Sequence, residues 1–74
     1  LINVRVKEKR DLASVPAVAA VMSGVGARLA GAGRLLVRYS GTEPLLRIML
    51  EGRDPEEIKQ WGEEIATAVR SHLG

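Results

Sequence analysis

The chain has 74 residues, of which 46% are hydrophobic, and a formal net charge of +2 at pH 7. Such a length supports one small domain, and the small net charge excludes a global electrostatic attraction to nucleic acid or membranes. The absence of cysteine excludes disulfides and thiolate metal sites, and no apolar run approaches the roughly 20 residues that span a bilayer. No signal peptide is recognisable, so we expect a cytoplasmic protein.

The first residues predict a β-strand with one buried face. Ile2, Val4 and Val6 alternate with polar residues, which is the period-two pattern of a half-buried strand. The charged residues at 7–11 then predict a solvated loop, with docking to another domain as the alternative. Because the chain opens at Leu1 inside this strand and without a methionine, we expect it to be a piece of a longer protein.

An amphipathic helix is predicted in the alanine-rich stretch that follows. Asp11 or Ser14 is expected to cap it, with Pro16 in its first turn. Gly24 and Gly26 each cost about 1 kcal/mol relative to alanine within a helix, so we expect the helix to bend or end early. Apolar residues at three- and four-residue steps form its buried stripe, which consists of Val18, Met22, Val25 and Leu29.

The second half of the chain predicts two strands and a second helix. The strands cover 34–39 and 45–51, where apolar and polar side chains alternate. Asp54 is expected to cap the helix, with Pro55 in its first position and Glu57 closing a capping box. The buried stripe of this helix consists of Ile58, Trp61, Ile65 and Val69.

The element order β-α-β-β-α predicts an α+β fold in two layers, with residues 1–74 forming a single domain. Both helices are expected to pack on one face of a mostly antiparallel sheet, because the alternating strands have only one apolar face to bury. Sorting the side chains by face puts Arg5, Arg38 and Arg47, together with Ser40, on the helix-free side. Hairpin pairing is expected to bring Arg38 and Arg47 to the same end of the sheet.

The turn between the last two strands has the composition of an anion-binding site. Residues 38–47 read R-Y-S-G-T-E-P-L-L-R. Gly41 can adopt a positive φ and let backbone N–H groups approach a ligand, as in anion-binding nests. Ser40 and Thr42 supply hydroxyl donors, and an arginine supplies a planar fork that fits phosphate. The turn therefore predicts a site for a phosphate or a carboxylate.

Other interpretations of these residues stay open. The turn can be an ordinary reversal, with hydroxyls that satisfy local backbone groups and arginines that are solvated or paired with Glu43 and Glu51. An RNA-binding module is a second class of function, but Tyr39 is assigned to the core face and Trp61 to a helix, which leaves no stacking platform. A domain that docks through its sheet is a third. No nucleophile–base pair, carboxylate dyad or metal-ligand cluster is recognisable, so no catalytic or metal-binding residue is predicted.

Residues 34–52 resemble the C-terminal domain of the α-D-phosphohexomutases. The S-G-T-E-P core marks that superfamily, and the following L-L-R-I-M-L-E-G together with the opening I-N-V-R-V resembles the phosphoglucosamine mutase branch most. A phosphomannomutase/phosphoglucomutase domain is the alternative within the superfamily. The resemblance implies a TBP-like fold, as the fourth of four domains of a cytoplasmic isomerase that supplies amino sugars for peptidoglycan precursors.

The resemblance also implies a division of roles between domains. A phosphoserine on the first domain exchanges the phosphoryl group, the second domain holds a Mg²⁺, and this fragment alone is inactive. The implied partners are a hexosamine phosphate and the other domains of the same chain, with neither nucleic acid nor a membrane among them. The implied phosphate-binding residues are Arg38, Ser40, Gly41, Thr42 and Arg47, with Tyr39 and Glu43 as second-tier candidates.

Overall fold

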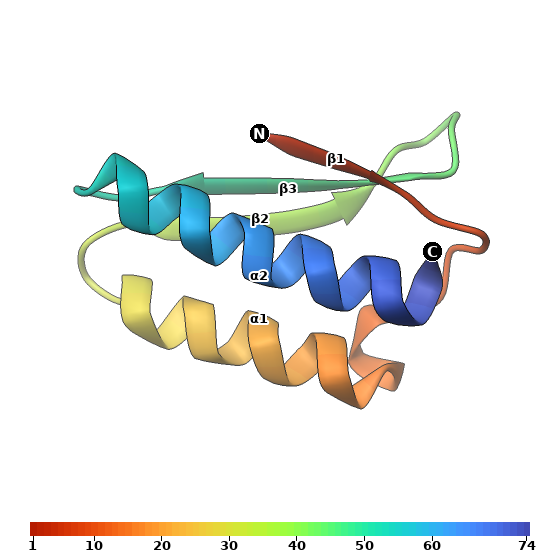
Figure 1. Cartoon of the computed structure of the whole chain (residues 1–74), viewed down its shortest axis with the longest axis horizontal. Helices are drawn as coiled ribbons and strands as arrows, with labels where there is room; N and C mark the ends of the chain where they lie inside the picture. The colour runs from red at the N-terminus through yellow and green to blue at the C-terminus, as the bar shows by residue number, and fades with distance from the viewer.

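The computed structural model describes all 74 residues of the chain. The elements are β1 (Ile2–Arg5), a short 3-10 helix (Leu12–Ser14), α1 (Pro16–Leu29), β2 (Arg34–Tyr39), β3 (Leu45–Glu51) and α2 (Pro55–Leu73). The three strands form one layer, and both helices lie against the same face of it (Figure 1). The predicted order β-α-β-β-α and the two-layer α+β class are therefore confirmed. No helix combines the length and the apolar character that a membrane span requires.

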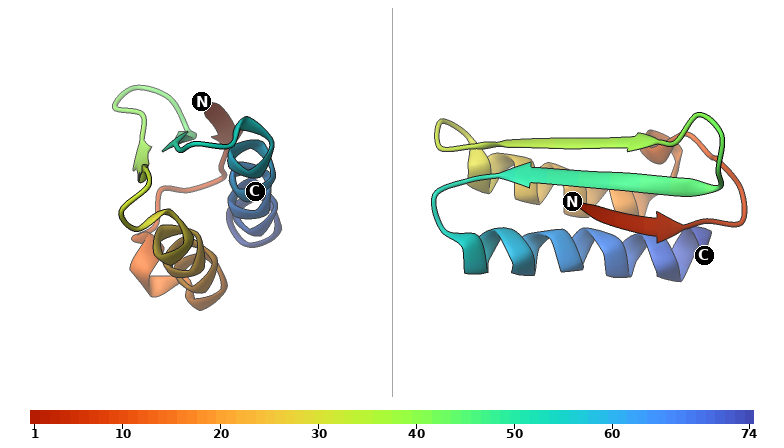
Figure 2. Two further views of the ribbon diagram at one scale, coloured as in Figure 1. Left: turned by 90° about the vertical axis from the view of Figure 1, so that its left-hand side faces the viewer. Right: turned by 90° about the horizontal axis from the view of Figure 1, so that it is seen from above.

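The sheet has the strand order β1-β3-β2, with antiparallel pairing at both contacts. Figure 2 shows β3 between its two neighbours when the sheet is viewed from above. Because β3 is central, its inward side chains are covered on both sides by other strands and from below by the helices. Leu46 and Ile48 of β3 are accordingly fully buried, with 0% of their surface exposed.

The hydrophobic core lies between the sheet and the helices and contains 12 buried residues. The predicted helix stripes supply much of it. The stripe residues that are buried are Val18, Val25, Leu29, Ile65 and Val69. Three others from the predicted stripes are half-buried and pack on the margin of this core: Met22, Ile58 and Trp61. Trp61 is partly covered by Arg28, whose guanidinium carbon lies 5.8 Å from the ring centroid. Arg28 also pairs with Glu64 at 3.0 Å, so it links α1 to α2.

The start of α2 follows the sequence prediction in part. Asp54 Oδ1 accepts hydrogen bonds from the backbone N–H groups of Glu56 at 3.0 Å and Glu57 at 3.5 Å, and Pro55 occupies the first turn. These bonds satisfy donors that have no partner within the helix. The Glu57 carboxylate makes no return bond to Asp54, so the predicted capping box is only half formed.

The start and length of α1 differ from the prediction. Asp11 caps the short 3-10 helix instead, where its carboxylate accepts from the N–H of Ala13 at 3.1 Å. Val15 therefore precedes α1 without a side-chain cap, and Pro16, which has no N–H to satisfy, begins the helix. Gly24 and Gly26 do not interrupt α1, which continues to Leu29 because its apolar side still packs on the core.

Candidate anion-binding site

The loop at 40–44 connects β2 to β3 and extends beyond the end of the sheet (Figure 1). The strands themselves place the arginines that flank it. Arg38 and Arg47 are direct partners in the β2–β3 register, and Arg47 is also the partner of Asn3 on β1. Directly paired residues of antiparallel strands project from the same face of the sheet. The predicted placement of Arg38 and Arg47 at one end of the open face is therefore confirmed.

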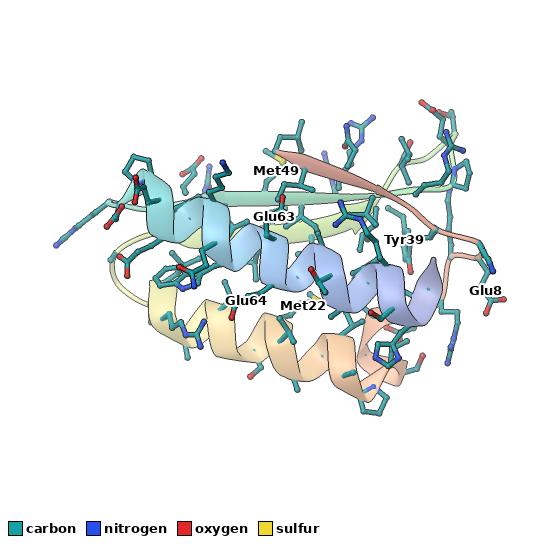
Figure 3. All side chains as sticks on the ribbon, viewed as in Figure 1. Glu8, Met22, Tyr39, Met49, Glu63 and Glu64 are labelled. Carbon is teal, nitrogen blue, oxygen red and sulfur yellow. The ribbon has the colours of Figure 1, made fainter.

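A third arginine lies on the same face near the loop. Arg5 pairs with Leu45, the first residue of β3, and it is exposed. In Figure 3 the side chain of Met49 points away from the helices and thus identifies the open side of the sheet. Arg5, Arg38 and Arg47 will be called the arginine cluster. Its members come from three different strands, so the sheet holds their backbones in fixed relative positions.

The arginine cluster has no acidic partner within the domain. None of its three members forms an ion pair or a side-chain hydrogen bond. Arg34 provides the contrast, because it lies on the same strand as Arg38 and makes two hydrogen bonds of 3.1 Å to Glu51. Arg38 and Arg47 therefore do not pair with Glu43 or Glu51; both are exposed to solvent, which is the other form of the ordinary-turn interpretation. Like charges directly opposite each other on adjacent strands are destabilising. The arrangement therefore favours a bound anion.

Ser40 has a different place from the one predicted. It was assigned to the open face, but only 6% of its surface is exposed. Its Oγ accepts long hydrogen bonds, both of 3.4 Å, from the N–H groups of Thr42 and Glu43, and its own N–H donates to Leu45 O at 2.9 Å. The strand ends at Tyr39, so the alternation of faces no longer applies at the next residue. Ser40 is therefore buried and stabilises the loop through hydrogen bonds with the loop backbone.

Gly41 also departs from the prediction. Its φ is not positive, since Gly31 is the only residue in that region, with a φ of 77°. The loop therefore lacks the left-handed residue that defines a nest. A Cβ added at Gly41 would have no atom of this domain within 4 Å, so the fold itself does not require glycine. The Gly41 N–H makes no hydrogen bond within the domain. Gly41 is exposed in the loop that joins the strands of Arg38 and Arg47, so its N–H is a free donor there.

The loop is attached at both ends to the segment that follows β1. Lys9 Nζ donates to Ser40 O at 2.6 Å, and the N–H of Val6 donates to Pro44 O at 2.9 Å. The sequence prediction of a solvated segment missed Lys9. The contact depends on the register of β1, which leaves the sheet opposite Leu45 so that the next residues pass beside the loop, and the sequence alone does not give that register.

Tyr39 supports the loop from the side of the core. It lies at the end of β2 (Figure 3), half-buried, and its hydroxyl donates to the carbonyl of Arg10 at 2.7 Å. Burial raises the pKa of Tyr39 above its ordinary value of 10.0. Trp61 lies on α2, so the open face of the sheet carries no aromatic side chain on which a base could stack. The RNA-binding alternative gains no support from this arrangement.

Replacing Tyr39 with phenylalanine is expected to lower the free energy of unfolding by about 0.5–1.5 kcal/mol at neutral pH, because the bond to Arg10 is lost. The raised pKa means that the neutral hydroxyl stabilises the folded state below pH 10 and that this contribution is lost as pH rises through the folded-state pKa. Urea unfolding of both proteins at about pH 8 and about pH 11 should therefore show the difference shrinking at the higher pH. A difference that stays constant would contradict this role of Tyr39.

Neither the largest groove of the domain nor a metal site involves the loop. The largest groove, of about 640 Å³, is lined only by residues of α1 and α2. No group of three or more histidine, cysteine, aspartate or glutamate side chains could hold a metal ion. What the loop region offers is an exposed amide, the long-bonded amides of Thr42 and Glu43, and the unpaired arginines. These groups can bind an anion, but they include no nucleophile with an adjacent base.

The fold and the loop define a small α+β domain with exposed, unpaired arginines beside the loop at one end of its sheet. The chain belongs to the family described as "Phosphoglucomutase/phosphomannomutase, C-terminal domain", whose model matches residues 1–68. The resemblance to the phosphohexomutases is thereby confirmed.

Relatives from three bacteria match along the full 74 residues. They are the phosphoglucosamine mutases of Pelobacter propionicus and Geotalea daltonii, each 54% identical to this chain, and that of Geobacter metallireducens, which is 55% identical. In each case the match covers 100% of this chain and 16% of the relative. The chain thus corresponds to one small part of those proteins.

Proposed function

We propose that this chain is the substrate-phosphate-binding domain of a phosphoglucosamine mutase, the isomerase that interconverts glucosamine 6-phosphate and glucosamine 1-phosphate. The observation that carries the proposal is the direct pairing of Arg38 with Arg47, both without acidic partners, beside the unbonded N–H of Gly41. The high identity to phosphoglucosamine mutases supports this substrate over the mannose and glucose phosphates of the wider family.

In this proposal the loop binds the phosphate that does not react. Each guanidinium of Arg38 and Arg47 presents a planar fork, and the amide of Gly41 adds a donor from the loop side. Binding energy from a remote phosphate can position the sugar for transfer at its other end. In the proposed complex all of these donors bind the phosphate and none binds a sugar hydroxyl. The same site can therefore accept a phosphate on either carbon of the hexosamine, as an interconversion of the two isomers requires.

The chemical step is proposed to lie outside residues 1–74. A Mg²⁺ does not fit this chain, because it has no cluster of acidic or histidine ligands. We place the metal and the phosphoserine on other domains of the same enzyme, which would be located in the cytoplasm. The 74-residue chain alone is therefore expected to bind phosphate without catalysing isomerisation. The role of this domain is to hold and orient the substrate.

An NMR titration of the chain with glucosamine 6-phosphate tests the proposal. Chemical-shift changes are expected at the loop and its arginines, namely at Arg38, Ser40, Gly41, Thr42 and Arg47, with smaller changes at the neighbouring Tyr39 and Glu43. Inorganic phosphate should shift the same signals, because the proposed contacts are to the phosphate group alone. Changes that are confined to other surfaces, with the loop signals unmoved, would overturn the proposal.

Replacing Gly41 with alanine should separate binding from stability. The free energy of unfolding is expected to change by less than about 0.5 kcal/mol, because the added Cβ meets nothing in the domain. The KM of the full-length mutase for the sugar phosphate should rise by about tenfold or more, because the methyl group blocks close approach to the amide.

Gly24→Ala is the matched control for this substitution. Gly24 also has open space around it, but it lies in α1. Alanine there is expected to stabilise the helix by about 0.5–1 kcal/mol and to leave the KM unchanged. Equal KM values for the native enzyme and the Gly41→Ala variant would count against close contact between the phosphate and the loop backbone.

A further inference from the structure

The charged segment at 7–10 contacts the end of β2 and the first residue of the loop at two adjacent points. Lys9 Nζ donates to the carbonyl oxygen of Ser40 at 2.6 Å. The hydroxyl of Tyr39, one residue earlier, donates to the carbonyl of Arg10 at 2.7 Å. These two bonds cross between the same two segments in opposite directions. Together they fix the segment against the point where β2 becomes the loop.

The bond from Lys9 fixes the orientation of the whole peptide unit between Ser40 and Gly41. Ser40 O and Gly41 N belong to the same peptide unit, which is planar and trans, so the C=O and the N–H point in opposite directions. Turning Ser40 O toward Lys9 therefore turns the Gly41 N–H away from Lys9. That N–H is the loop amide that makes no hydrogen bond within the domain.

The bond from Lys9 also affects the strength of the Gly41 donor. A hydrogen bond from an ammonium to a carbonyl is charge-assisted and stronger than one between neutral groups. Hydrogen bonds in a chain polarise one another, so a carbonyl that accepts a hydrogen bond from a cation makes the N–H of its own peptide unit a better donor. Ser40 Oγ restrains the loop only through bonds of 3.4 Å from the amides of Thr42 and Glu43. Lys9 thus provides the shortest hydrogen bond to the loop.

We propose that Lys9 is a positioning residue of the anion site, which orients the Gly41 N–H toward the bound phosphate by holding the Ser40 carbonyl. This inference rests on the proposed function, because it assigns a role in binding the same phosphate. Lys9 acts through the peptide unit between Ser40 and Gly41. Its effect is therefore on the affinity for the phosphate and not on the chemical step.

The test uses the full-length mutase with Lys9→Met, which keeps most of the aliphatic stem and removes the ammonium. The KM for glucosamine 1-phosphate is expected to rise by about tenfold, with kcat changed less than about twofold, because the Gly41 N–H is no longer held toward the phosphate and its hydrogen bond to this anion is weakened. Amide hydrogen exchange at Thr42 and Glu43, whose N–H groups bond to Ser40 Oγ, should become faster in the free enzyme. Lys9→Arg retains a charged donor and is expected to restore the KM to within about threefold of the native value.

Lys7→Met is the matched control, because its ammonium belongs to the same segment and makes no hydrogen bond or ion pair. It should leave both KM and loop exchange unchanged. An unchanged KM in Lys9→Met, alongside a raised KM in Arg38→Ala, would overturn the role of Lys9 while leaving the proposed function intact. Unchanged KM values in both variants would overturn both. If Lys9→Met lowers the melting temperature, Lys9→Arg decides the inference. A stable Lys9→Arg variant with a KM as high as that of Lys9→Met would contradict the role of Lys9.

Discussion

Arg38→Ala is expected to raise the KM of the full-length mutase for glucosamine 1-phosphate by about 10- to 150-fold. The basis is the loss of at least one hydrogen bond between charged groups, which contributes roughly 1.5–3 kcal/mol. Arg47→Ala should have a similar effect, because the two residues are direct partners on the open face. Steady-state kinetics of both variants measure this change.

Although Arg38→Ala is expected to weaken substrate binding, it is not expected to destabilise the fold. Removing one of two opposed like charges should leave the free energy of unfolding unchanged or raise it by up to about 1 kcal/mol. Arg34→Ala is the matched control, because Arg34 lies on the same strand but is paired with Glu51. That variant should lose at most about 1 kcal/mol of stability, as expected for an exposed ion pair, with no change in KM. A KM that rises equally in Arg34→Ala and Arg38→Ala would show that general surface charge, not this pair, governs binding.

Ile48→Ala is expected to lower the free energy of unfolding by about 2–5 kcal/mol. Ile48 is fully buried in the central strand, where its partners are Ile2 and Val37. The loss combines the transfer free energy of the deleted atoms with the cost of the cavity left behind. A domain of this size has a total stability of only about 4–11 kcal/mol, so the loss would remove much of it. Urea unfolding followed by circular dichroism measures the change.

The neighbouring Met49 offers the control for this substitution. Its side chain lies on the open face and 41% of the residue is exposed, so Met49→Ala should cost less than about 1 kcal/mol. Equal losses at the two positions would contradict the assignment of faces on which the site geometry also depends. The same alternation that buries Ile48 places Arg47 outside.

The arrangement of elements was predictable because it depends on local periodicity. Alternation defined the last two strands, β2 and β3, with the bounds found in the structure, 34–39 and 45–51. The placement of Arg38 and Arg47 at the same end of the sheet followed from the short connection between those strands, while their direct pairing is a finding of the structure. The resemblance of the S-G-T-E-P turn to the phosphohexomutases then supplied the family, which composition and periodicity alone do not contain.

The details of the loop were not predictable because they depend on contacts between distant segments. Lys9 reaches Ser40 across 31 residues of sequence, and no local pattern marks such a contact. Ser40 was placed on the wrong face because the strand period was extended one residue beyond the end of β2. Gly41 was interpreted as a residue that can adopt a positive φ, but its φ is not positive. Asp11 or Ser14 was expected to cap α1, but the carboxylate of Asp11 caps the nearer 3-10 helix and α1 has no side-chain cap.

A crystal structure of the complete mutase with glucosamine 6-phosphate bound tests the central claim most directly. We predict that the phosphate lies within hydrogen-bonding distance of the Gly41 N–H and of both guanidinium groups, those of Arg38 and Arg47. A substrate phosphate bound by other residues, with these two arginines turned to solvent or to another domain, would contradict the account.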